Sequence, residues 1–230
     1  SASAVHCPRP VRGRGGCLGH GCAVRGSGGS TTATALPYVY GDWGRLYARV
    51  DTFGVKTLPL GDGHLELAAR VSTEGYKARK TDFATAGDRS TPVPVGLGTF
   101  QRTALGGVFA YVFHDTISGG QLLELTWAGR VPLGSATLYP QLGLEHRTAA
   151  YVQHLYGVSG VQVGPGLSSY QAGASTAPVL SLHATVPLHG PWALQLQTRY
   201  RAWDSAVRNS PLVDRSSQLS GYAALTYSWN

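Results

Sequence analysis

Charged side chains are scarce in this chain. Asp, Glu, Lys and Arg make up 13% of its 230 residues, about half the share usual in soluble domains. Long hydrophobic runs are missing as well, because the longest nearly apolar stretch, residues 104–113, is far shorter than the roughly 20 residues of a membrane-spanning helix. If the chain crosses a membrane, it must do so with strands, since a closed β-barrel also satisfies every backbone polar group within lipid.

Methionine is absent, including an initiating one. This absence indicates a processed or partial chain. No signal peptide can be recognised, because no basic region leads into an apolar stretch near Ser1. We therefore expect that a signal peptide has been removed, and export must be inferred from the rest of the chain.

The first 35 residues differ in composition from the rest. They are rich in glycine and arginine, contain no acidic residue, show neither a helical nor a strand period, and hold all three cysteines, Cys7, Cys17 and Cys22. The spacing of Cys17, His20 and Cys22 matches no zinc site, and a fourth ligand is not evident. A Cys17–Cys22 disulfide stays open if the segment reaches an oxidising periplasm. We expect a disordered or non-native leader at residues 1–35.

The net charge of +7 arises largely in this leader. Outside it, the excess of basic over acidic residues falls to three. No basic stripe with interleaved aromatic residues is present there, so we expect no nucleic-acid binding.

From Leu36 onward, apolar and polar residues alternate with the period of two that indicates strands with distinct faces. The pattern recurs within residues 45–51, 64–74, 121–131, 136–145, 178–186 and 192–201. It is cleanest at the end, where one apolar face holds Leu219, Ala223, Leu225, Tyr227 and Trp229. Segments of about ten residues are typical of strands that cross a bilayer at a tilt, whereas soluble strands are usually nearer five or six. No segment of helical period competes.

The connections between these segments alternate in length. Residues 203–216, 147–174 and 76–92 form long connections, residues 187–191, 132–135 and a turn near 105 form short ones, and residues 114–119 are intermediate. Bacterial outer-membrane barrels have short periplasmic turns and longer external loops. The sequence therefore predicts an all-β fold, an antiparallel transmembrane β-barrel of about ten strands in residues 36–230. Twelve strands are possible if the leader is folded or has replaced native sequence.

The charged face of these strands is expected to line the lumen. The predicted lumen residues are Arg49, Glu66, Arg70, Glu124, Arg199 and Arg201. On the apolar face, Trp192 and Tyr200 lie about 20 Å apart along the membrane normal at a tilt of about 40°, as interfacial aromatic girdles require. Eight strands are filled by side chains and porins need about 16, so this lumen should be plugged by paired charges or admit only a narrow water path.

Several short motifs follow one another in order along the chain. They are His114-Asp115 with Ser118-Gly119-Gly120, Tyr139-Pro140-Gln141-Leu142-Gly143, Tyr156-Gly157-Val158-Ser159, Asp204 leading into Asn209-Ser210-Pro211-Leu212-Val213, and the closing Tyr227-x-Trp229, with Leu36-Pro37-Tyr38 further upstream. Over residues 36–230 the series resembles the MipA/OmpV family of outer-membrane proteins, the MltA-interacting proteins. Two features depart from the family: residues 1–35 lack its Gly-rich opening strand, and Asn230 follows the terminal aromatic residue.

The resemblance implies a Gram-negative outer-membrane location and a non-catalytic scaffold that links a lytic transglycosylase to a peptidoglycan synthase. It carries over no residue roles, and we expect no catalytic, cofactor-binding or metal-binding site and no cofactor. The expected partners are membrane lipids and lipopolysaccharide, the two cell-wall enzymes, and the barrel assembly machinery. That machinery would recognise Tyr227 and Trp229 at the end of the last strand.

An outer-membrane acyl hydrolase acting on lipid A or phospholipid is the main alternative, followed by an adhesin or small channel. Ser181 and His183 share a polar face, acids are available at Glu124 and Glu145, and His114-Asp115 precedes Ser118. A hydrolase needs its nucleophile within hydrogen-bond reach of an oriented base, and residues two apart on a strand, about 7 Å, do not fix that geometry. Neither a His-x-Ser-Asn nor a Gly-x-Ser-x-Gly motif occurs. We therefore expect His114, His183 and Glu124 to be lumen or loop residues in hydrogen-bonded networks.

Overall fold

A computed structural model describes residues 15–27, 30–49, 51–71, 90–159, 168–213 and 215–229, with the backbone alone for residues 15–38 and 229. Antiparallel strands dominate these residues. The strands are β1 (Gly15–Ser27), β2 (Ser30–Trp43), β3 (Leu46–Arg49), β4 (Thr52–Leu60), β5 (Gly63–Arg70), β6 (Pro94–Thr103), β7 (Gly106–Asp115), β8 (Gln121–Ala128), β9 (Val131–Leu133), β10 (Ala136–Arg147), β11 (Ser175–Pro187), β12 (Trp192–Ala202) and β13 (Ser217–Trp229). Two helices, α1 (Ala149–Tyr156) and α2 (Ser205–Arg208), complete the described elements.

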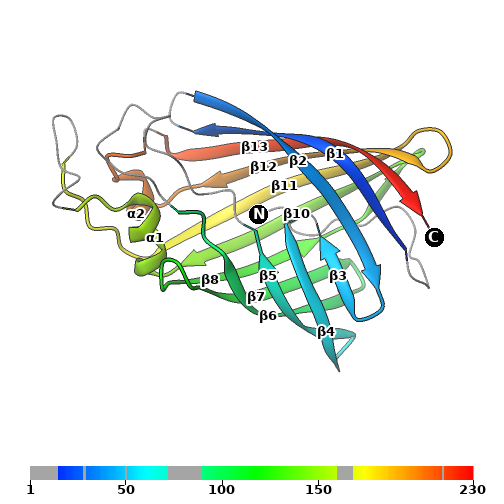
Figure 1. The fold of residues 1–230 in the computed structure, drawn as a ribbon, viewed down its shortest axis with the longest axis horizontal. Coiled ribbons are helices and arrows are strands. Elements are labelled where there is room, and N and C mark those ends of the chain that lie inside the picture. Colours follow the sequence, from blue (N-terminus) through cyan, green and yellow to red (C-terminus); the bar gives the residue numbers. More distant parts are fainter. Residues whose placement is uncertain are drawn as a thin grey trace.

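The strands close into a barrel (Figure 1). Each strand from β1 to β8 pairs with its neighbours in sequence, β10 to β13 continue the series, and β13 pairs with β1. The strands β8 and β9 pair with successive parts of β10, so together they occupy one position in the wall. The ring therefore has twelve positions. The predicted barrel is confirmed. It has twelve strand positions, which was the alternative, rather than the expected ten or so.

The expected leader is partly wrong, because its second half belongs to the wall. β1 pairs with β13 from Gly16↔Trp229 to Arg25↔Ser220, and with β2 along its whole length. Residues 15–27 and 30–35 are therefore strand, while residues 1–14 lie outside the described part. The alternation was not visible in the sequence because glycine has no side chain to show a hydrophobic period, and wall membership here depends on backbone pairing.

The geometry of β1 also excludes the Cys17–Cys22 disulfide that the sequence left possible. Cys17 and Cys22 lie five residues apart on one extended strand, which separates their Cα atoms by about 16 Å. A disulfide needs Cα atoms within about 7 Å. The two cysteines of β1 therefore cannot be joined to each other.

The long connections all lie at one end of the barrel, as expected. They follow β5, β10 and β12, the intermediate one follows β7, and the two helices lie at this end (Figure 1). The short connections after β1 and β3 lie at the same end. By the rule for outer-membrane barrels this end is external and the opposite end is periplasmic. No helical period is visible in the sequence, yet α1 and α2 occur in the connections after β10 and β12. Among the described residues, no helix is both long and apolar enough to cross a bilayer.

The two faces of the wall differ as the alternation predicts. Outward-facing leucines are about half exposed; they include Leu67, Leu97, Leu125, Leu142, Leu144, Leu180 and Leu225. Inward-facing positions are polar and buried; on β12 they are Gln195, Gln197, Arg199 and Arg201. Trp192 and Tyr200 lie on the outward face of the same strand, 43% and 42% exposed. The predicted orientation of both faces is confirmed.

Candidate functional site: the capped and charge-filled lumen

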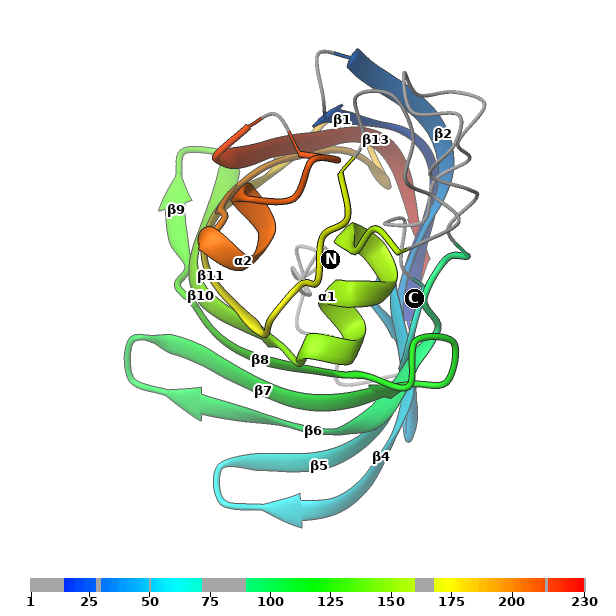
Figure 2. The ribbon, with the colours of Figure 1, turned by 90° about the vertical axis from the view of Figure 1, so that its left-hand side faces the viewer.

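Helix α1 lies over the external mouth of the barrel (Figure 2). Its Tyr151 and Leu155 are buried in a cluster with Phe113 of β7 and Leu122 of β8. Gly120, before β8, permits this approach, since a Cβ there would lie 2.4 Å from the backbone nitrogen of Tyr151. The helix is thus packed on the wall.

Helix α2 and the last long loop complete this cap. Val207 of α2 and Trp203 share a second buried cluster with Val152 of α1. The hydroxyl of Ser210 donates to the backbone oxygen of Tyr156 over 2.6 Å, and the Tyr156 ring meets Trp203 edge-on at 5.7 Å. These contacts tie the two long loops together across the mouth.

Several motif residues that carry the family resemblance stabilise this cap. The Asp115 carboxylate accepts hydrogen bonds from the backbone nitrogens of Val93 and Ser118, at 2.8 and 2.7 Å. The Asp204 carboxylate accepts from the Ser175 hydroxyl at 2.9 Å and from the Thr176 nitrogen at 2.7 Å. These acids therefore hold loops in place, a role that their positions in the sequence did not reveal.

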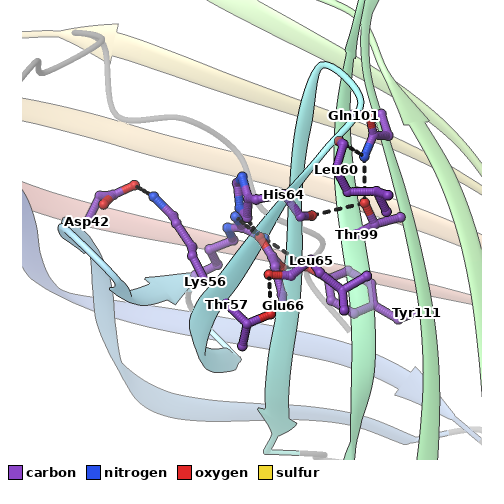
Figure 3. A network of polar contacts seen from close by, with 11 residues as sticks. Asp42, Lys56, Thr57, Leu60, His64, Leu65, Glu66, Thr99, Gln101 and Tyr111 are labelled. Atoms are coloured by element: carbon purple, nitrogen blue, oxygen red, sulfur yellow. Dashed lines mark hydrogen bonds and ion pairs between the residues drawn. The ribbon is translucent and has the colours of Figure 1, made fainter.

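Below the cap, the fully buried Glu66 of β5 is the centre of a polar network (Figure 3). It forms a bidentate ion pair with Arg49 of β3, with nitrogen–oxygen distances of 2.6 and 2.9 Å. The hydroxyl of Tyr111 on β7 donates to it at 2.5 Å, and Nε2 of His64 lies 2.6 Å away. The Arg49 guanidinium also lies over the Tyr47 ring at 4.1 Å. The network fastens the short strand β3 to β5 and β7.

Two further ion-pair groups bridge parts of the wall that are not neighbours. Arg70 of β5 pairs with Glu124 of β8 at 2.5 Å. Glu145 of β10 pairs with Arg147, with Arg199 and, at 2.7 Å, with Arg201. All six of the predicted lumen residues are buried. The mixed charges of the lumen are thus joined in pairs and clusters, as expected.

The residues considered for hydrolysis are brought to the lumen but not assembled. The Ser181 hydroxyl donates to the Thr198 backbone oxygen and accepts from Gln197. His183 contacts Gln195 at 2.9 Å through Nε2 and Tyr222 at 3.2 Å through Nδ1. The two acids considered, Glu124 and Glu145, are held by the arginines described above.

The third candidate group, His114-Asp115 with Ser118, is also separated. Asp115 and Ser118 shape the β7–β8 connection, whereas His114 is exposed on the outward face of β7. His183 and Glu124 are thus in luminal networks as expected, and His114 is not in the lumen. Within the described ranges, no group of three or more His, Cys, Asp or Glu residues could hold a metal ion.

Sequence reasoning placed the charged residues in the lumen but missed the cap. One signal was available, since Tyr151, Val152 and Leu155 are apolar at a spacing that puts them on one side of a short helix. A closed antiparallel barrel with apolar residues outside and paired charges inside is the architecture of an outer-membrane β-barrel.

Comparison with known proteins identifies the family of outer-membrane β-barrels to which this chain belongs. The family model described as MltA-interacting protein MipA matches residues 15–229, and the chain belongs to this family. The match begins at β1, so the presumed absence of the family's opening strand is also corrected. The MltA-interacting protein of Escherichia coli strain K12 is 29% identical over 56% of this chain and 53% of its own length. The chain thus matches about half of that relative.

Other relatives support the location. The putative outer membrane protein YiaT of Escherichia coli O157:H7 is 24% identical over 88% of this chain and 86% of its own length. The outer membrane protein Omp26La of Vibrio anguillarum is 23% identical over 60% of this chain and 55% of its own length. The protein is therefore an outer-membrane barrel of Gram-negative type.

Among solved structures, an anion-selective porin from Comamonas acidovorans is 8% identical, with a TM-score of 0.38, over 94% of this chain and 98% of the porin. The outer membrane protein OprG of Pseudomonas aeruginosa is 10% identical, with a TM-score of 0.29, over 95% of this chain and 97% of OprG.

Proposed function

We propose that this protein is a non-catalytic scaffold that connects a lytic transglycosylase and a peptidoglycan synthase to the outer membrane. The observation that carries the proposal is the lumen, which is covered by α1 and α2 at its external mouth and bridged by buried ion pairs. A barrel built in this way offers its surfaces, rather than its interior, for interaction. The name of the Escherichia coli relative supports a murein enzyme as one partner.

The arrangement of the hydrolase candidates favours a role without catalysis. An acyl hydrolase needs a nucleophile that gives its proton to a nearby base. Ser181 instead donates to a backbone oxygen, and His183 lies between a glutamine and a tyrosine. Neither residue contacts a carboxylate in these interactions, so the third member of a triad is not in place.

Binding to purified enzymes tests the proposal. The full chain is placed in lipid nanodiscs and mixed with a lytic transglycosylase, a peptidoglycan synthase, or both. We expect each enzyme to bind and the three proteins to co-migrate as one complex, whereas nanodiscs with an unrelated barrel bind neither. A barrel that binds neither enzyme, although it migrates as a folded species, contradicts the scaffold.

The hydrolase alternative is tested in the same nanodiscs. Fatty-acid release from lipid A and from phospholipid is measured for the unmodified chain and for Ser181→Ala. We expect no release above that of empty nanodiscs from either protein. Release that Ser181→Ala abolishes would establish the acyl hydrolase and remove the claim that the protein is non-catalytic.

A further inference from the structure

The five periplasmic turns of the described wall share one construction. Each holds one glycine with a positive φ, between 57° and 138°. These are Gly44, Gly61, Gly106, Gly134 and Gly190. Each glycine has an exposed leucine within two residues along the chain, and we call these five leucines the periplasmic rim: Leu46, Leu60, Leu105, Leu133 and Leu188.

The glycines make these turns tight. A positive φ suits glycine and strains other residues, so each turn has a defined backbone with few alternatives. Gly106 also lies so close to the next strand that a Cβ there would be 2.1 Å from the Ala128 backbone oxygen. The leucines therefore project from fixed positions, and little conformational freedom is lost when another protein binds them.

The exposure of Leu105 exceeds that of the outward-facing leucines of the wall, which are about half exposed. Leu105 is 79% exposed, the highest value among the large apolar residues of the described chain. It follows the last residue of β6, beyond the final pair of the β6–β7 ladder, Thr103↔Gly106. Leu188 likewise follows the Pro187↔Ala193 pair that ends the β11–β12 ladder. Both leucines thus lie in the turns, where the Leu188 nitrogen still donates to the Trp192 backbone oxygen at 2.9 Å.

The charge around the rim is mostly positive. Arg45, Arg102 and Arg130 are exposed at this end of the barrel. Lys56 and Asp42 pair with each other. Asp62 is then the one further acid among the described residues of this end. Basic residues around exposed apolar side chains suit a partner whose apolar surface is bordered by acidic side chains.

We infer that the periplasmic rim is the surface on which the lytic transglycosylase docks, through an apolar patch with an acidic border. The inference rests on the proposed scaffold function and adds the place and the chemistry of the contact. Leu105 and Leu188 are its main anchors, because they lie in the turns beyond the last paired residues of their ladders. The arginines contribute to the rate of association and make it dependent on salt.

Paired substitutions at the two ends of the barrel test the inference. Two variants of the full chain are placed in nanodiscs and titrated with the purified transglycosylase, alongside the unmodified protein. One is the double variant Leu105→Ser with Leu188→Ser, and the other is Leu105→Ser alone. Ile117→Ser is the matched control, since Ile117 is 48% exposed in the external β7–β8 connection. Heat-modifiable migration on gels identifies folded protein. We expect the double variant to bind about tenfold more weakly, as for truncated interface anchors, and the control to bind as the unmodified protein does.

The outcomes separate this inference from the function on which it rests. If the unmodified barrel does not bind the transglycosylase, the scaffold proposal is contradicted. If it binds, and both rim variants bind equally well, the scaffold remains but the rim is not its docking surface. Rim variants that insert less into membranes, yet bind normally once inserted, identify the leucines as lipid anchors and also overturn the inference. If the double variant does not fold, Leu105→Ser decides between these outcomes.

Discussion

The network around Glu66 gives the sharpest prediction about stability. Glu66 is completely buried and accepts hydrogen bonds from Arg49. It also accepts one from Tyr111 (Figure 3). In Glu66→Gln the Arg49 guanidinium stays in the lumen without its carboxylate, and the new amide group turns a donor toward other donors. Removal of one partner from a buried ion pair costs about 3–5 kcal/mol. We expect the free energy of unfolding to fall by about this amount.

The same region supplies a matched control. Lys56 and Asp42 form an ion pair whose side chains are 22% and 52% exposed, and an exposed pair contributes about 0–1 kcal/mol. Asp42→Asn should therefore change the free energy of unfolding by less than about 1 kcal/mol. A second variant, Glu66→Gln with Arg49→Met, should recover part of the loss, because it also removes the uncompensated charge.

Urea unfolding in lipid vesicles measures these values, with folded protein followed by its migration on gels without heating. The comparison requires similar dependence on urea for all variants, so that shifts of the midpoint report stability. If Glu66→Gln and Asp42→Asn lose equally little, the buried network does not stabilise the barrel, and the reasoning from burial is wrong. A double variant less stable than Glu66→Gln would show that Arg49 contributes through its contacts with Tyr47 and Tyr111 instead.

Three further predictions concern the barrel as a whole. The purified protein should show heat-modifiable migration and β-type circular dichroism in detergent, and a chain that stays soluble and monomeric without detergent would contradict the fold. In planar bilayers it should give no large stable conductance, because ion pairs bridge the lumen; steady steps of porin size would overturn this. Trp229→Ala should lower the amount inserted into the outer membrane more than Trp192→Ala does at matched synthesis, and equal losses would make Trp229 only an anchor.

The faces of the strands could be predicted from sequence because each depends on a single physical cause. A residue such as Leu196 faces outward, toward lipid, and its neighbours Gln195 and Gln197 face inward, so polarity alternates visibly along the chain. The end of the barrel at which each long loop lies follows from counting strands. Neither inference needs knowledge of which residues contact each other across the lumen.

The partners inside the barrel could not be predicted in the same way. Arg70 and Glu124 lie on β5 and β8, which two other strands separate in the ring. Whether they meet depends on the curvature of the wall and on the stagger of its strands, quantities that hydrophobic alternation does not contain. The sequence predicted about ten strands rather than twelve for a related reason. Glycine-rich β1 shows little alternation of apolar and polar residues, although its backbone pairs on both sides.

The pairing of β1 with β13 has a consequence for the order of elements along the chain. Gly16 lies opposite Trp229 at the periplasmic end, so a short linker between them would make the two strands an ordinary hairpin. The wall would then be continuous in covalent terms, and new termini could be placed in another connection, as circular permutation allows where ends lie close together. Opening the chain at the β11–β12 turn would make β11 the last strand and move Trp229 into the interior of the sequence. A permuted barrel of this kind would keep the same ring of strands but end on a different strand, so the effects of the two on assembly could be measured separately.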